Sequence, residues 1–145
     1  ALALDCLFGN SGSIYLALYE KGLVDENFSY SYVVNRGYSF GMVGGETDDP
    51  AKLRRNLDAE LKRALDDGLT RKECDRVRNK ALGDFARVFN APESIAQMLV
   101  GHHLRGTAFG DYRKMLFKIT RAELNRRLRE LLDPAVRSYG VALPR

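Results

Sequence analysis

The chain has 145 residues, enough for one domain with its own hydrophobic core. Apolar residues make up 45% and charged residues 29%, which is typical of a soluble globular protein and excludes a membrane-spanning or low-complexity chain. Residues 105–145 hold ten Lys and Arg against four Asp and Glu, so the last third is basic. Two cysteines, Cys6 and Cys74, are too few for a disulfide framework and predict buried free thiols. No signal-peptide pattern is present, and we expect a cytoplasmic protein.

The start of the chain is apolar and helix-prone over residues 1–8, with no N-cap residue before it. A domain seldom begins inside its own pattern. We therefore expect the opening strands to be missing, and residues 1–145 to be a single domain of a longer, two-domain or multi-domain chain. Residues 9–12 interrupt the pattern, and a second short helix is predicted over residues 13–21, with Gly22 after its end.

Alternating side chains in residues 28–34 and again in residues 38–43 predict a β-hairpin. A three-residue loop at 35–37 would pair Val34 with Tyr38. In that register all the large side chains lie on one face, which we expect to pack against helices. The opposite face would carry only small residues, namely Ser29, Ser31, Ser39 and Gly41.

Capping signals and helical periodicity account for most of the remaining chain. One helix is predicted over residues 50–67, with Asp49 as its N-cap and a leucine at every fourth position. Capping boxes at Thr70 and Thr120 begin two further helices, and another helix begins near Pro92.

The end of the chain and the order of the elements set the predicted fold class. A loop is predicted for residues 106–111, and a last strand is predicted from the alternation of Tyr139, Val141 and Leu143, closed by Pro144. The order of helices, hairpin, helices and strand predicts an α+β fold, in which helices cover one face of a mostly antiparallel sheet.

The residue types that zinc hydrolysis requires are scarce in this sequence. A hydrolytic zinc site commonly has three protein ligands, whereas the only histidines here, His102 and His103, are adjacent and would diverge by about 100° on a helix. Cys6 and Cys74 fall on apolar helical faces, where a thiol is usually inert packing. We therefore predict no catalytic residue, no metal ligand and no cofactor in this chain.

One long stretch carries a more specific pattern. Residues 7–15 (LFGNSGSIY), followed by residues 18–24 (LYEKGLV), resemble a signature of the insulinase/pitrilysin zinc peptidases. The strand pair, the strand end at 44–45, a long amphipathic helix, the helix start at 69–73 and the stretch 134–144 then follow in the family's order. The resemblance covers almost the whole chain.

Members of this family contain repeated α+β domains that face each other. One domain carries His-x-x-Glu-His and a distant Glu, which bind zinc and supply the general base, and the partner domain lacks that motif and helps to hold the peptide. This chain resembles the second kind, a C-terminal inactive peptidase domain.

The resemblance implies a non-catalytic domain that pairs with a homologous zinc-bearing domain of the same protein, a zinc metalloendopeptidase, and helps to enclose a peptide substrate. Residues 18–25 are similar to a bacterial, cytoplasmic subgroup. Where partner domains often carry an Arg and a Tyr, this sequence has Tyr19 and Asp25. We expect these two residues and the small hairpin face to lie toward the substrate.

Two other functions stay open on the sequence alone. The basic last third could bind nucleic acid, although Glu123 and Glu130 interleave with the arginines of one helix and no aromatic residues alternate with them. The parent protein could also have lost its own zinc site and act as an adaptor or structural subunit. A homodimer is a further open assembly.

Overall fold

The computed structural model describes residues 1–35 and 37–143, with the backbone alone at residue 109. The described part confirms the α+β class. Its strands are β1 (Ser29–Asn35) and β2 (Tyr38–Gly44), and its helices are α1 (Leu2–Phe8), α2 (Ser13–Glu20), α3 (Pro50–Asp67), α4 (Arg71–Arg87), α5 (Pro92–Leu104), α6 (Phe109–Lys118) and α7 (Arg121–Leu131). Two short 3-10 turns, η1 and η2, span Val88–Asn90 and Pro134–Val136.

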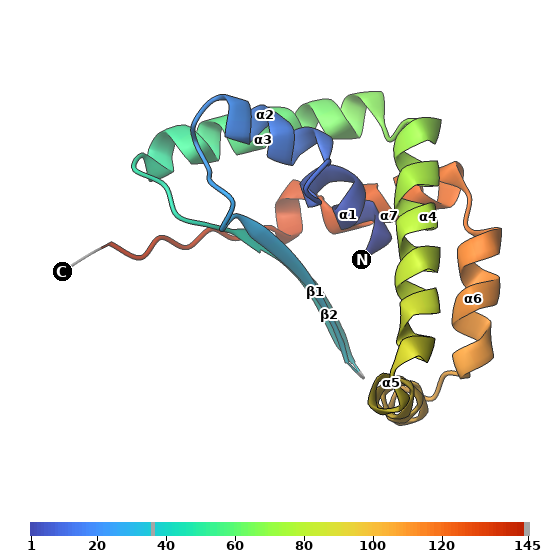
Figure 1. Ribbon diagram of the computed structural model, residues 1–145. Helices are drawn as coiled ribbons and strands as arrows, with labels where there is room; N and C mark the ends of the chain where they lie inside the picture. The colour runs from blue at the N-terminus through green and yellow to red at the C-terminus, as the bar shows by residue number, and fades with distance from the viewer. Residues whose placement is uncertain (36, 144–145) are drawn as a thin grey trace.

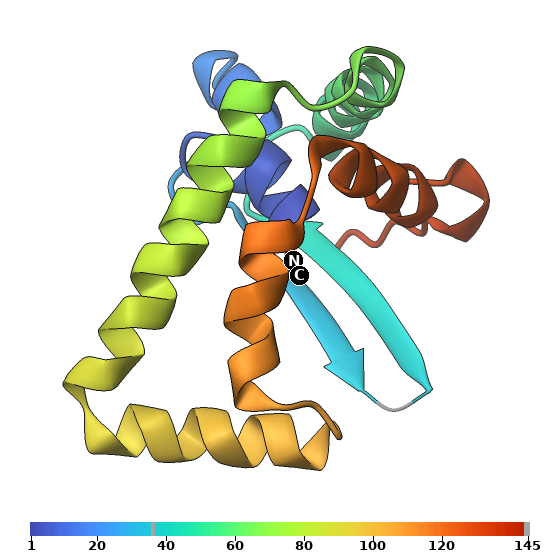
Figure 2. The ribbon, with the colours of Figure 1, turned by 90° about the vertical axis from the view of Figure 1, so that its right-hand side faces the viewer.

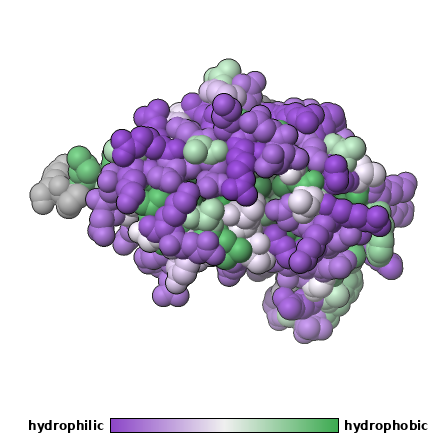
Figure 3. Space-filling model, turned by 90° about the horizontal axis from the view of Figure 1, so that it is seen from above, coloured by the Kyte–Doolittle hydropathy of each residue, from purple (hydrophilic) through white to green (hydrophobic). Residues whose placement is uncertain are grey.

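The helices gather around one end and one side of a single hairpin, which projects away from them (Figure 1). In the turned view, α4 and α6 stand side by side and α5 runs across their lower ends (Figure 2). The outer surface above α2 and α3 is mostly hydrophilic, as expected for helices that turn one stripe inward (Figure 3).

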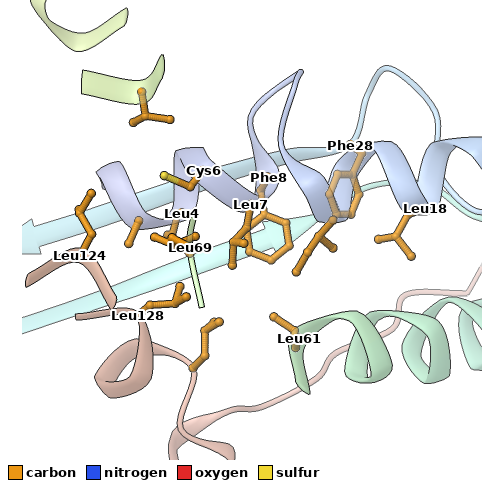
Figure 4. Packing of buried hydrophobic residues seen from close by; sticks show 14 of the residues in the cluster. Leu4, Cys6, Leu7, Phe8, Leu18, Phe28, Leu61, Leu69, Leu124 and Leu128 are labelled. Atoms are coloured by element: carbon orange, nitrogen blue, oxygen red, sulfur yellow. The ribbon is translucent and has the colours of Figure 1, made fainter. Parts of the chain in front are cut away.

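The core is organised around α1, which contacts α2, α4, α7 and β1. Its residues 3–8 are all buried, so the short helix is covered on every side. Leu4 and Leu7 lie on the side of α1 that faces Leu69 and Leu128 (Figure 4), and residues of α2, α3, α4, α7 and the hairpin complete the cluster. A helix that is apolar on nearly every side is stable only inside such a core, and its one acidic residue, Asp5, is buried as well.

Local capping signals placed several helix starts correctly. The Asp49 carboxylate accepts a hydrogen bond from the Lys52 N–H at 2.8 Å, which confirms it as the N-cap of α3. Thr70 and Glu73 form the complete capping box of α4. At α7, Thr120 accepts a hydrogen bond from the backbone N–H of Glu123, but the Glu123 carboxylate binds Arg126 and Arg127, so only half of the predicted box is formed among the described residues.

The hairpin register differs from the predicted one by a single residue. Asn35 pairs with Tyr38, so the connection has two residues, and Gly37 adopts a positive φ of 91°. Part of the predicted three-residue loop, Arg36, lies outside the described residues. Because side chains alternate along a strand, this shift turns every side chain of one strand to the other face relative to its partner.

The predicted segregation of large and small residues is therefore wrong. Tyr30 and Tyr32 lie opposite Val43 and Gly41 on the face that packs against the core. The other face combines small and large residues, which are Ser29, Ser31, Val33 and Asn35 of β1 with Gly44, Met42, Phe40 and Tyr38 of β2.

The predicted last strand is also wrong, because residues 137–143 form no strand. Side chains rather than a backbone ladder hold this segment to α3. The Tyr139 hydroxyl donates a hydrogen bond to the Asp58 carboxylate, and the Arg54 guanidinium lies 4.3 Å from the centre of the Tyr139 ring. Pro144, predicted to close the strand, lies outside the described residues.

Helix α6 begins inside the segment predicted as the loop 106–111. It packs on α4 through Leu116, which is fully buried, and through Tyr112, whose ring lies 5.8 Å from that of Phe85. Only this narrow stripe of α6 is covered, since Met115 and Phe117 are exposed.

Candidate functional site: the open face of the hairpin

The face of the hairpin that points away from the core is apolar and aromatic. Tyr38, Phe40 and Met42 are exposed to 56%, 44% and 62%, respectively. The rings of Tyr38 and Phe40 stack with their centres 6.2 Å apart. Large apolar side chains clustered in this way are unusual on a free surface and commonly mark a contact site. We call this set, with Ser29, Ser31 and Val33, the open face.

Ser29 and Ser31 lie on the open face, beside Met42 and Gly44. A shallow hollow of about 160 Å³ is lined by both serines and by Met42. Backbone and hydroxyl groups here stand next to an apolar side chain, an arrangement that suits an extended peptide better than a small charged ligand.

Ser39 and Gly41 do not share the face of the two serines, contrary to the prediction. They lie opposite Val34 and Tyr32 on the core-facing side. A Cβ atom at Gly41 would come within 3.0 Å of Leu4 Cδ1. The strand therefore approaches α1 closely at this point, and glycine has a packing role there.

Tyr19 and Asp25 have local partners. The Tyr19 ring lies 5.7 Å from that of Tyr15 on α2. The Asp25 carboxylate accepts hydrogen bonds from the Asn27 N–H at 2.9 Å and from the Asn27 side-chain amide at 3.0 Å. These bonds make Asp25 the first residue of the turn that leads into β1. The contacts do not join either residue to the two serines.

A buried carboxylate, which sequence reasoning missed, ties three elements together. Asp5 on α1 is only 8% exposed, and its carboxylate oxygens lie 3.0 and 2.9 Å from Lys80 Nζ on α4. The Tyr30 hydroxyl also bonds to this carboxylate, and burial followed by this bond raises the pKa of Tyr30. A Cβ atom at Gly9 would collide with the carboxylate, which explains the glycine there. The one sequence signal was an acidic residue inside an apolar run.

The two thiols are free and buried, as predicted. Burial, and next the neighbouring Cys74, raises the pKa of Cys6 to about 12. Burial is also the main cause of the raised pKa of Cys74. A thiol that stays protonated is a poor nucleophile and a poor metal ligand, so both cysteines act as core residues here.

The residues present do not fit a zinc ion. Within the described ranges, 1–35 and 37–143, no three His, Cys, Asp or Glu side chains gather in a way that could hold a metal. His102 Nδ1 lies 2.8 Å from the Thr107 hydroxyl oxygen, and the His102 ring lies 6.0 Å from that of Tyr112, while the adjacent His103 is exposed.

Two of the four arginines of α7, Arg126 and Arg127, are committed to ion pairs. Arg126 binds Glu123 at 2.6 Å and Glu130 at 2.7 Å, and Arg127 binds the same two carboxylates at 3.2 and 3.0 Å. Such pairing lowers the positive charge that this helix offers to a nucleic acid backbone. Among the described residues, no helix is long and apolar enough to cross a membrane.

Comparisons with known proteins agree with the fold described above. The chain is 32% identical over 129 residues to the uncharacterized zinc protease YmfH of Bacillus subtilis. The aligned residues make up 89% of this chain and 30% of YmfH. It is 28% identical to a crystal structure described as an M16-like peptidase from Alicyclobacillus acidocaldarius, with a TM-score of 0.82 over 89% of this chain and 31% of that one.

A third relative is similar in fold alone. The inactive peptidase domain of a Bordetella parapertussis protein assigned as a zinc protease superposes with a TM-score of 0.84 at 21% identity, over 99% of this chain and 80% of that one. No family model matches the chain. The chain spans about a third of the length of the two relatives from Bacillus subtilis and Alicyclobacillus acidocaldarius.

The fold defines a peptidase-type α+β domain built from a hairpin and a surrounding set of helices. The chain belongs to the insulinase-type, M16-like zinc protease family, as its sequence motifs predict.

Proposed function

We propose that this chain is a non-catalytic domain of a zinc-dependent peptidase, and that it helps to enclose a peptide substrate bound by a second domain. The observation that carries the proposal is that nearly the whole chain is similar to two known proteins, one in sequence and one in fold. The first is a zinc protease at 32% identity, and the second is an inactive peptidase domain at a TM-score of 0.84. The catalytic zinc would then reside in a homologous domain of the same polypeptide, and this chain would be the C-terminal member of the pair.

The open face is the surface that we assign to the enclosure. An extended peptide can lie along a sheet face and place alternate side chains against apolar groups. Phe40 and Met42 supply such groups, and Ser29 and Ser31 supply hydroxyls on the neighbouring strand, opposite Gly44 and Met42. Tyr19 and Asp25 remain proposed substrate neighbours from the family resemblance. The setting that we propose is the cytoplasm of a bacterium.

The role of the open face can be tested in the full-length protein that carries this domain. Met42→Arg adds a charge to the open face, and it should lower kcat/KM for peptide substrates while the zinc content of the protein stays unchanged. The matched control is Val136→Arg, because Val136 is at least as exposed as Met42 but lies in η2, outside the hairpin. Equal kcat/KM for the two variants would rule out a substrate role of the open face.

A further inference from the structure

A second concave surface lies among the helices and contains no residue of the hairpin. The beginning of α4, the end of α6 and the beginning of α7 meet there, at the upper end of the α4 and α6 pair in Figure 2. The hollow has a volume of about 460 Å³, which lies within the range of small-molecule and short-peptide sites. It is lined by Arg71, Cys74, Asp75, Arg78, Phe117, Lys118, Ile119, Thr120, Arg121 and Leu124. We call it the helical pocket.

The charge of the helical pocket is strongly one-sided. Its lining holds four basic side chains and one acidic side chain, Asp75. Asp75 is shared between Arg78 at 2.6 Å and Arg71 at 3.7 Å, so one carboxylate faces two guanidinium groups. Lys118 and Arg121 have no ion-pair partner within the described residues. The pocket therefore keeps a surplus of positive charge.

The position of Arg121 is unfavourable for the fold itself. It is the first residue of α7, where the helix dipole favours an acidic side chain. Arg71 stands in the same position at the start of α4. Two helix N-termini and four cations thus converge on one hollow. Glu73 and Glu123 lie in the first turns of the two helices, but Asp75 is the one carboxylate among the described residues that lines the hollow, and an anion bound there would relieve the repulsion further.

The remaining lining determines which anion fits. Leu124 and Cys74 form a buried apolar floor, and Phe117 is an exposed apolar wall with Arg113 5.6 Å from its ring centre. Hydrogen-bond acceptors are scarce, because the carboxylate of Asp75 and the hydroxyl of Thr120 are both engaged. The amino groups of nucleobases and the hydroxyls of sugars would find few partners here.

We propose that the helical pocket binds a peptide segment that carries a carboxylate side chain next to an apolar one. The carboxylate pairs with Lys118 and Arg121, and the apolar side chain covers the floor at Leu124. Guanidinium groups bind carboxylates well because their planar donors match the two oxygens. The site is separate from the open face and does not depend on the role proposed for that face.

The test uses the 145-residue chain and a synthetic peptide with the repeat Glu-Leu-Ser-Gly, labelled with an uncharged fluorophore. Binding is followed by fluorescence anisotropy at low salt. The double variant K118E/R121E should lower the affinity at least about tenfold, since both proposed carboxylate contacts become repulsive. The control R55E/K62E changes the net charge equally on the exposed side of α3, and it should alter the affinity by less than about twofold.

Folding is monitored separately by thermal melting. In K118E/R121E, the acidic residue gained in the first turn of α7 offsets the cation lost from the last turn of α6, so the melting temperature should change little. A loss of binding with an unchanged melting temperature is then not due to unfolding. The proposal is overturned if the peptide does not bind, if its Gln counterpart binds as tightly, or if both double variants lose affinity equally. It is also overturned if a single-stranded oligonucleotide displaces the peptide at lower concentration, because the ligand would then be a nucleic acid.

Discussion

The hairpin register makes a sharp prediction about two positions on opposite faces, Gly41 and Ser31. Gly41→Leu should destabilise the fold, because the new Cβ atom starts 3.0 Å from Leu4 Cδ1 and Leu4 is 2% exposed in a close-packed core. Overpacking of this kind costs about 1–3 kcal/mol. Replacing a strand glycine recovers about 0.5–1 kcal/mol of that.

The net loss expected for Gly41→Leu is therefore about 1 kcal/mol, within a range of about 0–2.5 kcal/mol. A loss of about 1 kcal/mol lowers the melting temperature of a domain of this size by about 2–4 °C. Ser31→Leu lies on the open face and should change the free energy of unfolding by less than about 0.5 kcal/mol. Circular dichroism melting of the two variants checks this. A stable Gly41→Leu together with an unfolded Ser31→Leu would refute the register and the assignment of the open face.

Three further results are expected. Asp5→Ala should cost about 1–3 kcal/mol in urea unfolding, because it leaves the Tyr30 hydroxyl without its acceptor, while the half-exposed Lys80 amine can turn to water. Lys80→Ala should cost at least as much, since it leaves the buried Asp5 carboxylate without its cation. The fold favours the protonated Cys6 thiol, and this preference adds fully to the free energy of unfolding below the ordinary thiol pKa of 9.0. The urea midpoint should therefore fall as the pH rises from 9 toward about 12, and it should fall less in Cys6→Val. Thr70→Ala removes the N-cap of α4 and should cost about 1 kcal/mol, measured by the same unfolding; no change would argue against the capping box.

Features fixed by neighbouring residues were predictable from the sequence. The cap at Asp49 and the box at Thr70 each depend on a bond to a residue three positions along the chain. The buried stripe of α4, which includes Cys74 and Val77, follows from helical periodicity alone. The family resemblance rested in the same way on the order and spacing of short motifs.

Features fixed by the exact length of a turn, or by distant contacts, were not predictable. The register depends on a turn that is one residue shorter than expected, and that difference moves Phe40 and Met42 to the open face. The end of the chain alternates like a strand, but Tyr139 and Arg137 both reach Asp58, 79 or more positions away. The pairing of Asp5 with Lys80 spans 75 positions and has no local signal.

The zinc content and peptidase activity of the purified chain, compared with those of the full-length protein, test the proposed division of labour most directly. We predict that the full-length protein contains stoichiometric zinc and cleaves peptides, and that the isolated chain contains none and cleaves nothing. An isolated chain that keeps one zinc ion through dialysis, and hydrolyses peptides until a chelator is added, would contradict the account.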